Sequence, residues 1–268
     1  MKKSFHLFYI FIVSISIIVL PSCTKQKGCT DNTATNYDSE AEEDDGSCTY
    51  NAETDVEIHF SSMVGTESLV YNQEYTINGR KVKFTRAQFY VSEIHLQQAD
   101  GGLVHLEDKY LLVHGEEHAY SIGKVASEHY HGISFSVGLD SAANHSDPAI
   151  YAADHALSSL DPNYTHWDWN SGYVFIRIEG YVDTTAAANG DADYGFFYHV
   201  GFDEFKRDID LDISQDLVGS TAEIGLKIDF AKFFLGVDMR TENATHSMDD
   251  MMLAGKIADN ADDAISAE

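Results

Sequence analysis

Apolar and polar residues alternate along most of the chain after residue 52. The clearest example is the segment 173–182, in which Val174, Ile176 and Ile178 share one face. The opposite face of this segment carries Tyr173, Phe175, Arg177 and Glu179. A period of two is typical of a strand with one face in a core. The same pattern predicts strands over 55–60, 81–96, 103–113, 132–139, 193–202, 205–214 and 221–230.

Eight strands with little helix predict an all-β fold, which we interpret as an antiparallel β-sandwich. The turn at 100–102, with two glycines, connects two of the strands as a hairpin. A short C-terminal helix is predicted from Ser247 to Asp259, with Ser247 as its N-cap. We expect its apolar side to consist of Met248, Met251, Met252 and Leu253.

One long segment, residues 140–170, contains no convincing strand. Loops of this length are uncommon and are usually functional or disordered. The composition favours order, because the segment carries both tryptophans of the chain, Trp167 and Trp169. It also carries His145, His155 and His166. We interpret it as a long ordered loop that builds a site, held by the strand that follows.

The chain of 268 residues is strongly acidic, with a formal net charge of −27 and only 17 lysines and arginines. This charge excludes nucleic acid as a partner, because nucleic-acid binding needs basic patches. It is consistent with a secreted protein or with attraction for cations. The 13 histidines are many for this length and supply candidate metal ligands.

The first 22 residues are typical of a signal peptide, with Lys2 and Lys3 followed by a short apolar run. Their end, up to Cys23, resembles a bacterial lipobox, which implies lipidation of Cys23 and attachment of the protein to a membrane. We therefore expect a lipoprotein of the bacterial cell envelope, on the periplasmic or outer surface. A plain secretion signal is the alternative.

Residues 24–52 predict a short acidic module closed by a disulfide between Cys29 and Cys48, the two cysteines that remain in an oxidising compartment. The segment resembles a small repeat found in secreted bacterial proteins, with the pattern GCTD…DDGSC. Calcium could bind to its carboxylates. We favour the interpretation that these side chains form turns with the backbone. The main domain is predicted over 53–262.

The histidines are the strongest sign of chemistry. His199 lies in the predicted strand 193–202, on the face opposite Phe196, Tyr198 and Val200, and is either a packed residue or a metal ligand. Imidazole is a common ligand of copper and zinc. The sequence has no HExxH motif, no GxSxG motif and no phosphate-binding glycine loop, so an enzyme is not predicted.

Several segments in order resemble the MbnP-like family, a group of periplasmic or surface copper-binding proteins related to MopE and CorA. The resemblance runs from residue 55 to 262 and rests on these stretches: FTRAQFYVSEIHLQQADG (84–101), HGISFSVGLDSAANHSDPA (131–149), ADHALSSLD (153–161), HWDWNSGYVFIRIEG (166–180), FYHVGFD (197–203) and KIADNADD (256–263).

The resemblance implies a copper site made of histidines and a kynurenine formed by oxidation of a tryptophan. It points to His199, His166 and His145, and then His155, as ligands, and to Trp167 or Trp169 as the modified residue. A di-haem peroxidase-like partner is implied for the modification. The best-known copper members have a histidine two residues after the modified tryptophan, and that position after Trp167 is Trp169 here.

The function predicted on this basis is copper acquisition or handling at the cell envelope. The alternative is a non-metal binding module that recognises a glycan, a peptide or a protein through the aromatic loop, because Trp and Tyr are frequent recognition anchors.

Overall fold

The computed structural model describes residues 25–268, except residues 33, 50–51, 116–118 and 169–171. The chain forms two compact units, Met1–Asn51 and Ala52–Glu268. The predicted signal peptide, Cys23 and Trp169 lie outside the described residues. In the described part, no helix has the length and apolar character that a membrane crossing requires.

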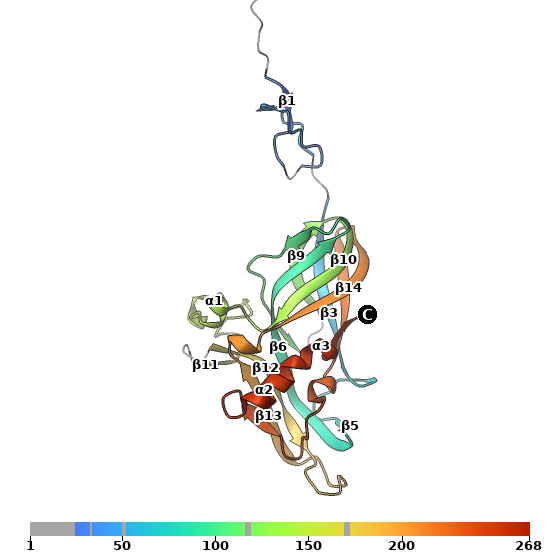
Figure 1. Ribbon diagram of the computed structural model, residues 1–268, viewed down its shortest axis with the longest axis vertical. Helices are drawn as coiled ribbons and strands as arrows, with labels where there is room; N and C mark the ends of the chain where they lie inside the picture. The colour runs from blue at the N-terminus through green and yellow to red at the C-terminus, as the bar shows by residue number, and fades with distance from the viewer. Residues whose placement is uncertain (1–24, 33, 50–51, 116–118, 169–171) are drawn as a thin grey trace, which may run out of the picture. The chain divides into compact units, whose positions relative to one another are not determined.

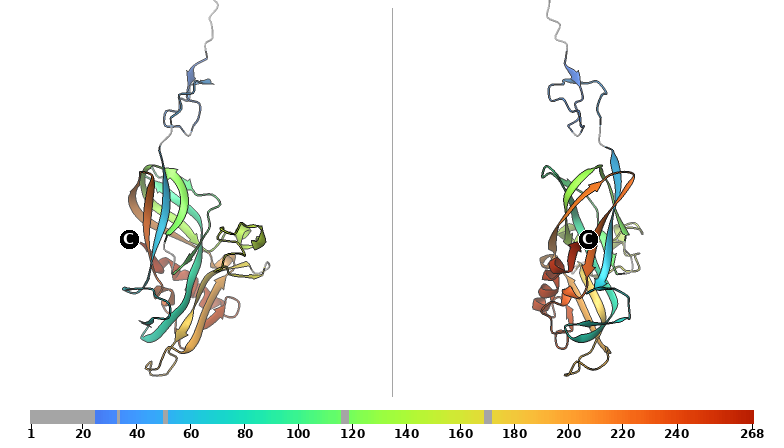
Figure 2. Two further views of the ribbon diagram at one scale, coloured as in Figure 1. Left: turned by 180° about the vertical axis from the view of Figure 1, so that it is seen from behind. Right: turned by 90° about the vertical axis from the view of Figure 1, so that its right-hand side faces the viewer.

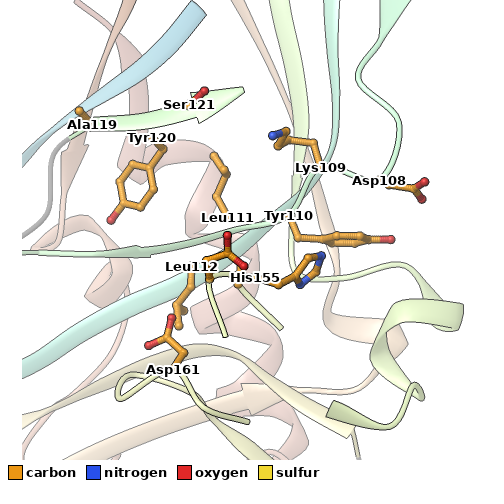
Figure 3. A pocket seen from close by; sticks show the side chains of 12 residues that line it. Asp108, Lys109, Tyr110, Leu111, Leu112, Ala119, Tyr120, Ser121, His155 and Asp161 are labelled. Carbon is orange, nitrogen blue, oxygen red and sulfur yellow. The ribbon is translucent and has the colours of Figure 1, made fainter. Parts of the chain in front are cut away.

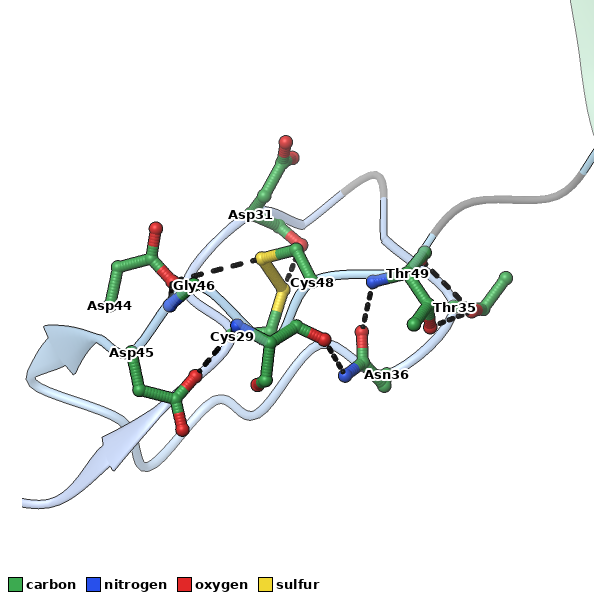
Figure 4. Close-up of a disulfide and its surroundings, with 10 residues drawn as sticks. Cys29, Asp31, Thr35, Asn36, Asp44, Asp45, Gly46, Cys48 and Thr49 are labelled. Carbon is green, nitrogen blue, oxygen red and sulfur yellow. Dashed lines mark hydrogen bonds between the residues drawn. A yellow bond between two sulfur atoms is a disulfide. The ribbon is translucent and has the colours of Figure 1, made fainter.

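The first unit is held by the predicted disulfide, which is confirmed between Cys29 and Cys48 (Figure 4). Two short strands, β1 (Lys27–Gly28) and β2 (Glu43–Asp44), pair in parallel. Asn36 connects the two ends of the loop, because its side chain donates to the Ser47 carbonyl oxygen and accepts from the Thr49 N–H.

The acidic side chains of this unit take part in local turns. Asp38, Asp44 and Asp45 each accept a hydrogen bond from the backbone N–H two residues further on. These are side-chain-to-backbone turns of the kind that Asp favours. Calcium binding by the unit stays a prediction.

The second unit confirms the all-β sandwich. Its larger sheet has ten strands within the described residues and is built around β6 (Arg80–Gln98). The order is β14 (Arg207–Leu217), β10 (Glu128–Val137), β6, β12 (Gly172–Val182), β13 (Tyr194–Gly201) and β16 (Ala244–His246). Also paired are β5 (Glu74–Ile77), β7 (Leu103–His105) and β8 (Leu111–His114) with β6, and β11 (His166–Asp168) with β12.

The smaller sheet has five strands among the described residues, in the order β17 (Ile265–Ala267), β15 (Thr221–Asp229), β3 (Glu53–Val64) and β4 (Glu67–Ser68), with β9 (Ala119–Ala126) paired to β3. Short helices complete the unit: α1 (Ser141–Asn144), η1 (Pro148–Ile150), η2 (Asp203–Phe205), η3 (Lys232–Phe234), α2 (Met251–Asp259) and α3 (Ala261–Ala264). Most strands pair antiparallel as predicted, but β3 with β15 and β13 with β16 are parallel.

The core lies between the two sheets and is rich in aromatic side chains. Phe84 of β6 is its centre, and its ring contacts those of Tyr75, Phe196, Phe230 and Phe234 at centroid distances of 6.0–6.4 Å. β6 passes through the whole unit (Figures 1 and 2) and contributes side chains along its length to this core.

The middle of β6 is buried on both faces, because the segment 140–165 covers its outer face. Gln88 is fully buried and donates to the Asn163 carbonyl oxygen at 2.8 Å. Tyr173 of β12 is buried in the same layer, where its hydroxyl donates to the Leu157 carbonyl oxygen at 2.7 Å. The prediction that this segment is ordered is thus supported, and it carries α1 and projects beside the sheet (Figure 2).

Three local predictions are wrong. Tyr173 and Phe175, expected on the outer face of β12, are buried, because the covering segment lies over that end of the strand. The segment 103–113 is two strands, β7 and β8, and not one. The C-terminal helix begins after Asp250, whose side chain accepts from the Leu253 N–H, and Ser247 is not its N-cap.

The predicted apolar side of that helix is correct only for Leu253, which is buried. Met248, Met251 and Met252 are exposed, with 74%, 48% and 86% of their surface accessible. Together with Leu253 the helix buries Ala254, Ile257 and Ala258, at intervals of three and four residues. In Figure 1, α2 lies over β13, against which it packs.

Gly180 marks the closest approach of two strands in the larger sheet. A Cβ atom at this position would lie 1.9 Å from the Lys83 carbonyl oxygen of β6, at a register shift between β12 and β6. Gly195, on the neighbouring strand, has nothing within 4 Å of the corresponding position. The absence of a side chain is therefore required at the first glycine and not at the second.

We expect Gly180→Ala to lower the free energy of unfolding by about 2 kcal/mol or more, because the methyl group forces the strands apart. Gly195→Ala is the matched control and should change it by less than about 0.5 kcal/mol. Urea unfolding of both variants measures the difference. Equal stability of Gly180→Ala and the wild type would contradict the close approach of β12 to β6.

Candidate functional site

Three neighbouring strands bring the histidines and the tryptophan of the site together. β11 folds back on β12, so that His166 lies opposite Tyr173. β12 in turn pairs with β13, where Val174 lies opposite Gly201 and Arg177 lies opposite His199. Residues more than thirty positions apart in the sequence thus meet at one end of the larger sheet.

Trp167 occupies its place because β13 has no side chain below it. A Cβ atom at Gly201 would lie 2.9 Å from the Trp167 ring and 2.5 Å from the Tyr173 carbonyl oxygen. The Trp167 ring also packs against Phe202, with ring centroids 5.3 Å apart. His166 is fixed on the other side by an edge-to-face contact with Tyr173 at 4.6 Å.

These residues surround a small pocket of about 200 Å³. Its walls are formed by Tyr164, Thr165, His166, Trp167, Val174, Arg177 and His199. The structure therefore brings together His166, Trp167 and His199 of the predicted site residues. The volume suits an ion with a few ligands and is smaller than the usual 300–1,000 Å³ of sites for drug-sized ligands.

A carboxylate on the outer face of β12 holds His199 in place. The Nε2 atom of His199 lies 2.7 Å from Oε1 of Glu179, and the same oxygen accepts from Nε of Arg177 at 2.7 Å. Burial would raise the pKa of Glu179, but the hydrogen bonds from His199 and Arg177 outweigh it and lower the pKa to about 2. Glu179 is therefore ionised at any physiological pH.

The charge of Glu179 determines which nitrogen of His199 is available. An ionised carboxylate only accepts hydrogen bonds, so Nε2 of His199 carries the proton that it donates. In the neutral ring, the lone pair then resides on Nδ1. A carboxylate behind the imidazole is the usual arrangement for a metal-binding histidine, because it fixes the tautomer and the orientation of the ring.

A second histidine lies beside His199 with the same type of partner. His246 of β16 is the direct neighbour of His199 in the parallel pair, and their ring centroids are 4.9 Å apart. Its Nδ1 atom lies 3.0 Å from Oδ2 of Asp249. Nε2 of His246 is thus its available nitrogen. The sequence analysis did not single out His246 or Glu179.

His145 and His155 lie outside this pocket. Nε2 of His145 lies 3.5 Å from Asp203, at the end of α1. His155 stacks on Tyr151 at a centroid distance of 4.4 Å and lines a different pocket with Tyr110 (Figure 3). Burial lowers the pKa of His155, which favours its neutral form.

The donor set restricts the kind of metal site. Among the described residues, no group of three or more His, Cys, Asp and Glu side chains is arranged to hold a metal ion. A tetrahedral site closed by four protein ligands, as in structural zinc sites, does not fit. Two imidazoles with one further donor fit an ion that accepts low coordination numbers, as Cu(I) does.

Comparison with known proteins is consistent with the fold. The model of the family described as MbnP matches residues 53–251. The chain belongs to the MbnP family. The solved structure of MbnP from Methylosinus trichosporium has a similar fold, with a TM-score of 0.55 and 15% identity over 73% of this chain and 84% of that chain. No curated protein matches the chain.

In this MbnP-family chain, the sequence could have indicated Glu179 but not His246. Arg177 and Glu179 already stand out as charged residues on one face of a predicted strand. The neighbourhood of His199 and His246 depends on a parallel pairing between strands separated by more than forty residues, and no local pattern reports such a pairing.

We expect the stabilising contribution of Glu179 to disappear in acid. Because its pKa is lower in the folded protein than its ordinary value, the contribution is complete above pH 5 and is lost as the pH falls toward 2. The difference in unfolding free energy between the wild type and Glu179→Gln should therefore shrink by roughly 2–3 kcal/mol over this range.

Denaturant unfolding at several pH values measures this difference. Glu57→Gln, on the exposed face of β3, is the control. A difference between wild type and Glu179→Gln that stays constant from pH 6 to pH 2 would disprove the contribution of ionised Glu179.

Proposed function

We propose that the protein is a copper-binding protein of the cell envelope that acquires or handles copper, and that the pocket between β11 and β13 holds the ion. The observation that carries this proposal is the position of His166, Trp167 and His199 around one pocket. Membership of the MbnP family supports copper as the metal. The proposed activity is binding, and no catalytic step is assigned.

Each residue of the pocket has a distinct role in this proposal. His199 provides Nδ1, oriented by Glu179 through the opposite ring nitrogen. His166, which also lines the pocket, provides the second imidazole. Trp167, after oxidation to kynurenine, provides a further donor where the described residues offer no third His, Cys, Asp or Glu.

The surroundings of the site agree with a role in capturing cations. The net charge of −27 attracts cations to the protein surface. Attachment through a lipid on Cys23 would keep the protein at the envelope, and a di-haem peroxidase-like partner would oxidise Trp167. The lipid anchor, the modifying partner and the location at the cell envelope are parts of this proposal.

Replacement of His199 tests the copper site. We expect the wild type to bind one equivalent of Cu(I) in the pocket and His199→Gln to lose this binding, because the residue provides the oriented ligand. Glu179→Gln keeps the ligand but loses its orientation and should weaken binding by about 10–100-fold. Competition with a colorimetric Cu(I) chelator measures these affinities.

His145→Gln is the matched control, because His145 is a histidine of the same segment outside the pocket. His166→Gln and His246→Gln then identify the second ligand, and we expect the larger loss for His166→Gln. Equal Cu(I) affinity of His199→Gln and the wild type would remove the basis for the pocket as the copper site.

Oxidation of the tryptophan is tested on protein isolated from its native envelope. We expect mass spectrometry to find the tryptophan-to-kynurenine mass change in the peptide with Trp167, and fragmentation to place it on that residue. Protein produced without the modifying partner is the control and should carry unmodified tryptophan.

An unmodified Trp167 in the native protein would contradict the role of kynurenine. Binding of a glycan or peptide that resists chelators and disappears in Trp167→Ala would favour the non-metal interaction module instead.

A further inference from the structure

A second pair of histidines lies on the other side of the larger sheet's central strand, away from β13. His95 of β6 and His105 of β7 occupy directly opposite positions in an antiparallel pair. Their ring centroids are 4.3 Å apart, and the rings are inclined by 70°. Side chains at such opposite positions start from Cβ atoms about 4.5–5.5 Å apart, so both rings reach the same point in space.

The spacing of the rings suits one shared metal ion. Two bonds of about 2.0–2.1 Å that meet at roughly 90–110° place the centroids of two imidazole rings about 4.5–5 Å apart. The observed 4.3 Å is within a small side-chain adjustment of this range. The backbone already fixes the distance, because β6 and β7 are hydrogen-bonded neighbours.

Among the described residues, no carboxylate engages a ring nitrogen of His95 or His105. His199 and His129 are each engaged by a carboxylate at 2.7 Å. Within the described residues, the contact between their two rings is the one side-chain interaction that His95 and His105 make. One ring nitrogen of His95 and one of His105 can therefore be directed at the same ion.

The histidine pair also lies in an acidic pocket of about 290 Å³. Its lining includes the carboxylates Glu93, Glu107, Asp108 and Asp140 and one basic residue, Lys109. Glu93 is bound to Lys206 and Ser136, and Asp140 caps α1 and accepts from Tyr110. Glu107, two residues after His105, is an exposed carboxylate in the lining of the same pocket.

We propose that His95 and His105 form a second metal site, for a divalent transition-metal ion, with one imidazole from each strand. Imidazole with carboxylate and water oxygens suits divalent ions of this class, and Cu²⁺ binds such donors most tightly in the first-row series. Water completes the coordination. The negative wall of the pocket attracts the ion to the site.

The test uses the mature protein with His199→Gln as background, so that the pocket proposed above does not contribute. Cu²⁺ is the probe, at pH 7.4 in a weakly coordinating buffer. Calorimetry should find one equivalent of Cu²⁺, and electron paramagnetic resonance should show coupling to two ligand nitrogens. A spectrum with oxygen ligands alone would overturn the proposal.

Single and double variants show whether the two rings bind one ion together. We expect His95→Gln and His105→Gln each to weaken Cu²⁺ binding at least about tenfold, and the double variant to lose little more. Losses that add up fully would indicate two independent imidazoles and contradict the shared site. His59→Gln, a half-buried histidine on β3 of the other sheet, is the control and should leave the affinity unchanged.

Discussion

The pairing of β12 with β6 is the constraint on which both the core and the proposed copper pocket depend. β6 supplies inward side chains such as Phe84 to the aromatic core, and β12 must lie close enough for Gly180 to touch the Lys83 carbonyl. This close contact fixes the position of β12 relative to β6, and therefore the position of β13, which pairs with β12. The outward row from Arg177 and Glu179 to His199 follows directly from the register of these strands.

The half-buried charge of Glu179 on this row determines which nitrogen of His199 can bind a ligand. Removing Glu179 from water has a cost, which hydrogen bonds from two cationic or polar donors offset. The result is an ionised carboxylate that holds one nitrogen of His199 and leaves the other for a ligand. The fold thereby determines the tautomer of His199, although the strand pairing itself requires no particular tautomer.

The sequence predicted the parts of this arrangement that are periodic. The alternation along 193–202 placed His199 on the outer face, and the strand over 173–182 was predicted nearly to its ends. It failed where another segment covers a strand, since Tyr173 and Phe175 are buried by residues far away in the chain. It also failed at Met248, Met251 and Met252, which are exposed. The apolar residues of this short helix do not by themselves indicate which of its faces packs against the sheet.

Non-local pairing is the second reason why the site was only partly predictable. His246 reaches His199, and His105 reaches His95, through strand pairs whose register cannot be deduced from alternation alone. Spacing along the chain therefore predicted a larger ligand set, including His145 and His155, than the pocket contains.

The proposed copper pocket and the pair His95 and His105 differ in a way that separates their proposed metals. At the proposed copper pocket, Glu179 fixes one nitrogen of His199, and the lining includes the rings of Tyr164 and Trp167. Such an environment offers few donors and favours an ion of low coordination number. His95 and His105 instead line an acidic pocket, where water can supply oxygen ligands. A divalent ion with a larger coordination shell fits there, so the two proposals assign ions of different charge and coordination number to histidines of one sheet.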